Sequence, residues 1–323
     1  MDLPKAAIAE AWDSQAFAEA ARSDTPFGNP DLASSFTGAE LTIVGDAILA
    51  ACDADDGLVD GMMFSPADCD FSPESLGPAG TGELSLVQVM SLQKVFSGAK
   101  NSAGEDLYSG WFWDPGIAAG GWRAWKIGPI APIPGNSGLN ITLGGGALPF
   151  IFTTEPNSMT HGTSLAEGTK IVTANPLGEA STIGFGDAFV PWILSFNMDS
   201  DAPKIYASDA TYTESAMDFM LSSDTDYANF KDEGNKLIVY SGQADPVFST
   251  KYHLQWYNEL IEKNGGLDAT RDFARLFLVP GMNHCGGGPA TSSFNALSAL
   301  MSWVEDNVTP ISIIATAPTD TPW

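Results

Sequence analysis

The last third of the chain alternates between short apolar runs and amphipathic stretches, and this alternation restricts its fold more than any other feature. Residues 236–240 and 273–279 are apolar runs of strand length, and residues 250–263 between them repeat apolar side chains at helical spacing. A glycine-rich loop and a second helical stretch, capped by Ser292 or Ser293, follow. Strands that alternate with helices over short links form parallel sheets. Two strands are too few for such a sheet, so the pattern predicts that further strands come from elsewhere.

The first two thirds of the chain have a different texture. Residues 8–21 and 41–52 carry the apolar spacing and the scarcity of breakers that are typical of helices. From about residue 53 to about residue 200, Gly, Pro, Ser and Asn interrupt short apolar runs, and aromatic side chains cluster. This texture predicts an irregular domain rather than a layered α/β unit. The aromatic stretch of residues 111–125 could line a phenolic pocket or form the core of that domain.

The chain is strongly acidic, with 40 Asp and Glu against 14 Lys and Arg and a formal charge of −26. Such a surface repels nucleic acid and anionic lipid, so neither is an expected partner. The acids are spread along the sequence, which indicates a well-solvated surface. The sequence contains no run of roughly 18 apolar residues, so we expect no transmembrane helix. The first residues also lack the basic and apolar regions of a signal peptide.

Two residues with catalytic chemistry follow the two predicted strands. Asp245 lies five residues after Tyr240, and His284 lies five residues after Val279. Loops at the carboxyl ends of parallel strands meet at one edge of the sheet, where functional residues gather. A carboxylate there can hold the Nδ1–H of an imidazole and support its positive charge. The order acid, then histidine, is that of α/β-hydrolases. The alternative is an ordinary turn aspartate and a histidine with a structural role.

The sequence around these two residues resembles a known family. Gln-Ala-Asp-Pro at residues 243–246 and Val-Pro-Gly-Met-Asn-His-Cys-Gly-Gly-Gly-Pro at residues 279–289 closely resemble the tannase and feruloyl esterase family, as does the tail of residues 294–305. The resemblance implies an α/β-hydrolase that hydrolyses aromatic (phenolic) carboxylic esters such as gallates or ferulates. It assigns the triad acid to Asp245 and the general base to His284. Cys285 then matches a cysteine that the family ties by a disulfide to a cysteine just before the nucleophilic serine.

A second match lies near the start, at Cys-Asp-Ala-Asp-Asp-Gly-Leu-Val-Asp-Gly-Met, residues 52–62. Carboxylates this close together suit a hard cation that prefers oxygen ligands. The segment resembles the calcium loop in the lid domain of the family. The resemblance implies a structural Ca²⁺ held by the carboxylates of Asp53, Asp56 and Asp60 and by the carbonyls of Leu58 and Met62. The loop is not an EF-hand, since Phe64 stands where the bidentate Glu would be. The alternative is a solvated acidic loop.

The three cysteines leave at least one sulfur without a partner in this chain. The resemblance pairs Cys52 with Cys69 and leaves Cys285 as the unpaired tether cysteine. The alternative is that Cys52 and Cys69 are reduced, since disulfides depend on an oxidising compartment. By resemblance, the protein is expected to be secreted or periplasmic.

The nucleophile of the family lies in a Gly-Cys-Ser-x-Gly-Gly segment, and this chain contains no Gly-x-Ser-x-Gly. We therefore expect the C-terminal part of an α/β-hydrolase with a large irregular lid inserted. Residues 1–45 would end a core segment, residues 46–200 would form the lid with the calcium loop, and residues 201–323 would form the core that carries Asp and His. The serine and one oxyanion donor would come from a missing N-terminal segment or a second polypeptide. The chain alone is expected to be inactive.

Two other functions stay open. The chain could be a non-catalytic, calcium-stabilised binding or regulatory remnant of the family. It could also be an α/β enzyme that uses a local serine, Ser241 or Ser249, with His284. The remaining histidines have no matching role: His253 is interpreted as a surface or packing residue of a helix, and His161 lies in a loop without a motif.

Overall fold

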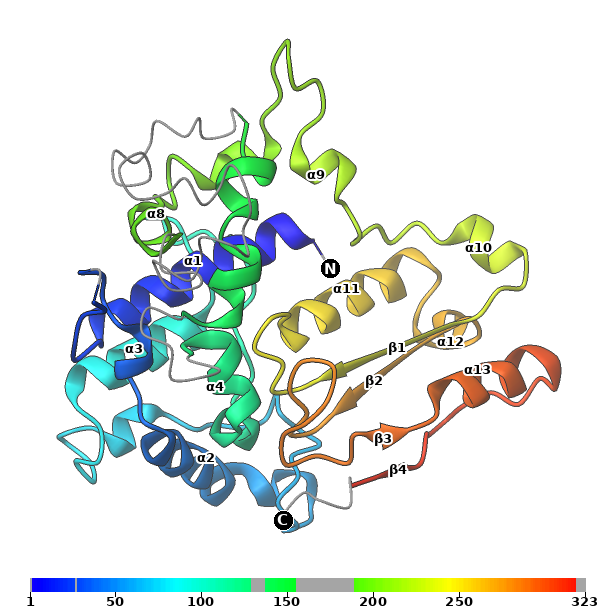
Figure 1. Cartoon of the computed structure of the whole chain (residues 1–323). Coiled ribbons are helices and arrows are strands. Elements are labelled where there is room, and N and C mark those ends of the chain that lie inside the picture. Colours follow the sequence, from blue (N-terminus) through cyan, green and yellow to red (C-terminus); the bar gives the residue numbers. More distant parts are fainter. Residues whose placement is uncertain (1, 27, 129–136, 155–188, 318–323) are drawn as a thin grey trace. The chain divides into compact units, whose positions relative to one another are not determined.

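The computed structural model describes residues 2–26, 28–128, 137–154 and 189–317 (Figure 1). The chain divides into two compact units, each built from three segments. Unit 1 comprises Met1–Val44, Ser72–Trp111 and Arg123–Ser222, and unit 2 comprises Gly45–Phe71, Phe112–Trp122 and Ser223–Trp323. The domain boundaries expected from the sequence stay a prediction. The segment with the predicted calcium loop groups with the C-terminal α/β residues rather than with most of the irregular region.

Unit 1 is built on helix α1 (Leu3–Glu19), which packs against α3 (Leu86–Ser97). Helix α1 begins earlier than its apolar pattern predicts, because Pro4 is suited to a first helical turn. The indole of Trp12 donates a hydrogen bond to the carbonyl of Lys94, which fixes α1 on α3. The other elements of the unit are short: η1 (Leu32–Ser34), η3 (Pro73–Leu76), η5 (Asn140–Gly144), η6 (Leu148–Phe152), α8 (Val190–Ser195), η8 (Ala202–Tyr206) and α9 (Ala216–Phe219).

An ionic cluster lies inside unit 1. The ammonium of Lys126 contacts Glu10 at 2.8 Å and Asp13 at 2.6 Å, and it lies 4.0 Å from the centre of the Trp111 ring. Burial raises the pKa of Glu10 to about 8, although Lys126 opposes that rise. Burial also raises the pKa of Asp13. Two carboxylates against one ammonium leave a net negative charge, which a proton on the cluster removes.

Unit 2 contains the predicted parallel strands, β1 (Leu237–Gly242) and β2 (Ala274–Val279). They pair in register from Leu237 opposite Ala274 to Gly242 opposite Val279. Helices α10 (Ala228–Asp232), α11 (Thr250–Lys263) and α12 (Leu267–Arg271) belong to the same α/β region (Figure 1). Residues of α11 and of the start of β2 form its core: Tyr257, Leu260, Phe273 and Ala274.

The last helix, α13 (Ala296–Glu305), packs on β1, and its Trp303 is buried, with the cations of Lys236 and Arg275 at 5.5 and 5.8 Å from the ring centre. Short strands β3 (Ser293–Phe294) and β4 (Ala315–Thr316) pair antiparallel beside it. Tyr240 of β1 is 51% exposed. In the described part of the chain, β1 and β2 form a sheet of two strands.

Helices α2 (Gly38–Cys52) and α4 (Gly120–Lys126) each cross from one unit's segments to the other's. The short helix η2 (Asp53–Asp56) follows α2, and η4 (Pro115–Ala118) precedes α4. Residues 112–122, which include η4, lie within unit 2 and contact the loops that follow β1 and β2. This segment becomes important at the candidate site.

Candidate active site

Asp245 occupies the turn that follows β1, and its carboxylate is fully engaged. Oδ1 accepts the backbone N–H groups of Val247 at 2.8 Å and Phe248 at 3.0 Å. Oδ2 lies 3.0 Å from Nδ1 of His284. The residue is only 8% exposed. Local bonds to the turn therefore fix one oxygen and aim the other at the imidazole.

His284 lies on the loop that follows β2, and the structure brings it to Asp245 as their positions after parallel strands predicted. An ionised carboxylate only accepts hydrogen bonds, so the hydrogen of this contact belongs to Nδ1 and the lone pair of the ring belongs to Nε2. The Phe248 ring packs edge-on against the imidazole, with centroids 5.6 Å apart. The His284 side chain is 19% exposed. A neutral imidazole held in this way can accept a proton at Nε2.

The histidine loop needs glycine at two positions. Gly281 and Gly288 both have left-handed backbones, with φ of 69° and 81°. A Cβ on Gly281 would lie 2.1 Å from the carbonyl oxygen of Pro289, and a Cβ on Gly288 would lie 2.0 Å from that of Gly281. The loop therefore closes tightly on itself, and this closure presents His284 at its tip.

Asp114 supports this loop and was missed by the sequence analysis. Its Oδ1 accepts the N–H of Gly116 at 2.7 Å, and its Oδ2 accepts the N–H of Gly281 at 3.1 Å. Burial raises the pKa of Asp114 to about 6, against the effect of these two N–H groups. The sequence Asp-Pro-Gly at residues 114–116 predicts a local turn capped by Asp114. It does not predict the contact of the Asp114 carboxylate with Gly281, 167 residues away.

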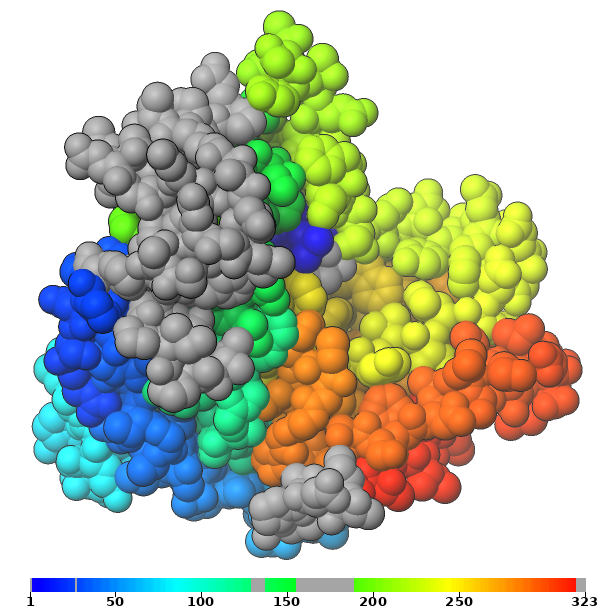
Figure 2. Space-filling view, viewed as in Figure 1, coloured from blue at the N-terminus to red at the C-terminus, as the bar shows by residue number. Residues whose placement is uncertain are grey.

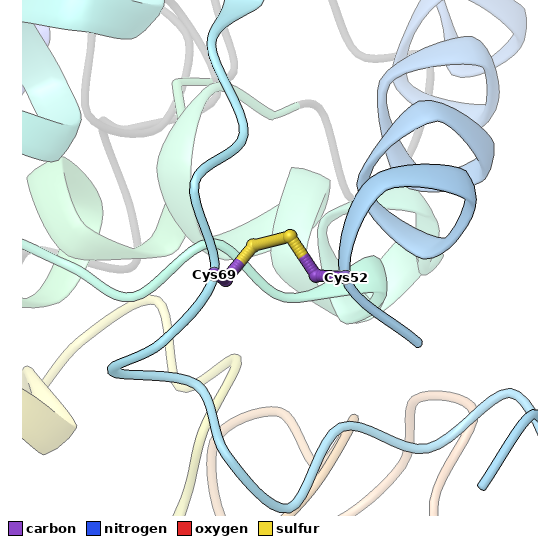
Figure 3. The surroundings of a disulfide bond; sticks show 2 residues. All are labelled: Cys52 and Cys69. Carbon is purple, nitrogen blue, oxygen red and sulfur yellow. A yellow bond between two sulfur atoms is a disulfide. The ribbon is translucent and has the colours of Figure 1, made fainter. Parts of the chain in front are cut away.

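The predicted calcium loop is closed by a disulfide bond between Cys52 and Cys69, as Figure 3 shows. Cys285 is an exposed free cysteine. The pairing that the family resemblance implied is thus present in the structure. The disulfide joins Cys52, at the end of α2, to Cys69 in the segment after the acidic loop. It therefore fixes the two ends of that loop.

The three carboxylates predicted to bind calcium accept backbone N–H groups within the loop. Asp53 accepts from Gly61 at 3.0 and 3.2 Å, Asp56 accepts from Leu58 and Phe64, and Asp60 accepts from Met62. Among the described residues, no three Asp, Glu, His or Cys side chains are grouped so as to hold a metal ion. The donor set is nevertheless the kind that Ca²⁺ prefers. The calcium site stays a prediction.

The remaining candidate residues have less to do with the site. His253 is half-buried in α11, and burial lowers its pKa to about 4, so its ring is neutral near pH 7. His161 lies outside the described residues. Trp111, Phe112 and Trp122 are buried, as core residues are. No helix in the described ranges combines the length and apolar character of a membrane span.

An acid after one parallel strand and a histidine after its neighbour, joined through Nδ1, is the acid–base arrangement of α/β-hydrolases with a Ser-His-Asp triad. The chain belongs to the tannase and feruloyl esterase family, whose model matches residues 5–322.

Individual relatives agree with this membership. The mono(2-hydroxyethyl) terephthalate hydrolase of Piscinibacter sakaiensis is 33% identical over 334 residues, which cover 97% of this chain and 51% of the relative. Feruloyl esterase B from Aspergillus oryzae shares the fold with a TM-score of 0.61 at 18% identity, over 95% of this chain and 53% of that structure. Tannin acyl hydrolase from Aspergillus niger gives a TM-score of 0.58 at 20% identity, over 97% and 52%. The chain thus spans about half the length of each of these three proteins.

Proposed function

We propose that this chain supplies the acid and the base of a Ser-His-Asp hydrolase that cleaves aromatic carboxylic esters. The observation that carries the proposal is the 3.0 Å contact between Oδ2 of Asp245 and Nδ1 of His284, at the ends of β1 and β2. A serine attacks the ester carbonyl while His284 takes the serine proton at Nε2. His284 then protonates the leaving alcohol, and water releases the acid from the acyl-enzyme. Asp245 keeps the imidazole oriented and supports its charge.

We further propose that the serine and one oxyanion donor come from residues outside this sequence, so that the chain is the C-terminal portion of the functional hydrolase. Two observations support this. The sequence contains no Gly-x-Ser-x-Gly. In addition, Tyr240 and the outer face of α13 are apolar and open, with Leu297 at 67% exposure and Met301 and Val304 also exposed. Helix α13 lies uncovered at the surface in Figure 2. Apolar faces of this kind are usually covered in the functional protein.

The substrate class follows from the chemistry that the relatives' names specify. Terephthalate and ferulate are aromatic carboxylates, and the relatives carrying these names are hydrolases of their esters. The acidic loop is proposed to bind a structural Ca²⁺ through Asp53, Asp56 and Asp60, with the carbonyls of Leu58 and Met62. The Cys52–Cys69 disulfide supports an oxidising compartment, secreted or periplasmic.

The purified chain is assayed with methyl gallate and methyl ferulate beside a His284→Ala variant. Both are expected to give only background hydrolysis, because an Asp–His pair without its serine has no atom to acylate. If the upstream coding sequence encodes an in-frame Gly-Cys-Ser-x-Gly-Gly, the longer product is expected to hydrolyse these esters in a His284-dependent manner. Robust turnover by the 323-residue chain that His284→Ala abolishes would overturn the proposed origin of the serine. Binding of the esters by a longer product that does not turn them over would favour a non-catalytic remnant.

A further inference from the structure

Asn283, the residue before His284, has a buried side chain that makes three hydrogen bonds to main-chain atoms. Its side chain Nδ2 donates to the carbonyls of Gly116 at 3.1 Å and Ala244 at 3.2 Å. Its Oδ1 accepts the N–H of Trp122 at 3.1 Å. The residue is only 2% exposed. Both donors and one acceptor of the carboxamide are therefore used, in a setting where water does not compete.

These partners connect the two catalytic loops. Ala244 directly precedes Asp245, and Asn283 directly precedes His284. A second bond joins the same backbones, from the N–H of Ala244 to the carbonyl of Met282 at 3.1 Å. The carboxamide of Asn283 therefore sets the separation of the two main chains from which the acid and the base project.

The third segment, residues 112–122, is itself anchored to the histidine loop. Asp114 joins Gly116 to Gly281 through its two carboxylate oxygens. The packing is so close that a Cβ on Gly116 would lie 2.3 Å from the Cβ of Ala244. A Cβ on Gly121 would lie 2.9 Å from Oδ1 of Asn283. Asn283 thus sits at the point where three chain segments meet within unit 2.

A side chain that merely filled this space would not need to be polar. An apolar residue of similar size would leave the carbonyls of Gly116 and Ala244 and the N–H of Trp122 without their Asn283 bonds, and buried main-chain groups left unmatched are costly. The loops would relax to recover partners. Because His284 is the next residue, such a relaxation would change the angle and length of its contact with Asp245.

We propose that Asn283 is a positioning residue for the Asp245–His284 pair, whose three hydrogen bonds hold the two loops at the separation that keeps the imidazole proton on Nδ1. Its importance for catalysis rests on the proposed ester hydrolysis, but its effect on the imidazole is a property of the chain without substrate. Asn283 does not touch the reacting atoms and acts only through the two loops.

Nitrogen-15 NMR of the full 323-residue chain, labelled at histidine, measures the ratio of the Nδ1–H to the Nε2–H tautomer directly. The chain has three histidines, so His161→Gln and His253→Gln variants assign the His284 signals. The wild type is expected to be almost entirely the Nδ1–H tautomer. Asn283→Ala is expected to lower this ratio by about tenfold or more, because the preference for Nδ1–H rests on one hydrogen bond to the charged Asp245 carboxylate.

Asn264→Ala is the matched control within unit 2. The Asn264 side chain also donates from Nδ2 to two main-chain carbonyls, those of Thr225 and Leu260, but away from the catalytic loops. It is expected to destabilise the fold while leaving the His284 tautomer ratio unchanged. If Asn283→Ala does not fold, Asn283→Asp keeps the volume and the Trp122 bond but loses both donors, and its ratio is expected to fall in the same direction.

A folded Asn283→Ala or Asn283→Asp chain with the wild-type tautomer ratio would overturn the proposal. An equal fall in Asn264→Ala would also overturn it, because general loosening would then explain the effect. Neither result depends on whether the chain hydrolyses an ester. Failure of this inference is therefore distinguishable from failure of the proposed function.

Discussion

Replacing Gly116 by alanine tests the contact between residues 112–122 and the catalytic loops. The new Cβ would lie 2.3 Å from the Cβ of Ala244 and 2.7 Å from the carbonyl oxygen of Gly281. Ordinary van der Waals contact begins at 3.4 Å, so the closer of these contacts is 1.1 Å too short (3.4 minus 2.3). The obstacles are a Cβ and a main-chain oxygen, neither of which can rotate away. The segment or one of the loops must move.

The magnitude follows from three contributions. Overpacking of this kind costs about 1–3 kcal/mol. The main-chain bonds of Gly116 to Asp114 and Asn283 would be strained, and each is worth about 1 kcal/mol. Alanine lowers the conformational entropy of the unfolded chain, which offsets about 0.4–1 kcal/mol of this destabilisation. Gly116→Ala is therefore expected to lower the free energy of unfolding by about 3 kcal/mol.

The assay is urea denaturation of the oxidised chain, followed by tryptophan fluorescence and circular dichroism. Gly120→Ala is the matched control, since its Cβ would meet nothing within 4 Å and its position opens helix α4. That change is expected to be neutral or to stabilise by about 0.5–1 kcal/mol, because alanine is the better helix former. If Gly116→Ala is as stable as Gly120→Ala, the close packing of this segment on the loops is refuted.

Three further predictions concern other parts of the chain. Because burial raises the pKa of Glu10 from 4.5 to about 8, the folded chain holds a proton that the unfolded chain releases, and stability should fall as pH rises through that range. Between pH 6 and 8, above the pKa of about 6 of Asp114, the free energy of unfolding of the wild type should fall by on the order of 2 kcal/mol, and that of the Glu10→Gln variant should not. If melting temperatures of the two proteins fall equally with pH over this range, the prediction is contradicted. Cys52→Ser should cost about 3 kcal/mol in unfolding experiments, because it opens a disulfide across 17 residues, and reduced wild type should match it; equal stability of the oxidised wild type and the variant would count against that value. Calcium at a hundredfold excess over its Kd should stabilise the chain by about 2.7 kcal/mol, and melting temperatures that agree in EDTA and in calcium would remove the calcium assignment.

The parallel strands and their catalytic residues could be predicted from the sequence because each signal is local. Residues 236–240 and 273–279 are apolar runs, and β1 and β2 contain most of each. Asp245 and His284 each lie five residues after the end of an apolar run, and parallel pairing alone brings such residues together. Helix α11 begins at Thr250 as predicted, although Ser249 at the cap position makes no side-chain cap bond.

Features that depend on distant partners could not be predicted. Ser292 or Ser293 was expected to cap the last helix, which was wrong: Asn295 is the cap, and its Oδ1 accepts the N–H of Ser298. Ser293 instead belongs to strand β3, where it pairs with Thr316 of β4. The bonds of Asp114 to Gly281 and of Asn283 to Gly116 each span 167 residues. A pattern read within a short window contains no information about such contacts.

The central claim is that Asp245 and His284 are the acid and base of an esterase whose serine lies outside these 323 residues. Labelling with a fluorophosphonate, which reacts with activated serines, followed by peptide mapping tests it most directly. The chain and its His284→Ala variant are predicted to show the same absence of a specifically labelled serine. A single serine among residues 1–323 that is labelled in the chain, and not in the His284→Ala variant, would contradict the claim.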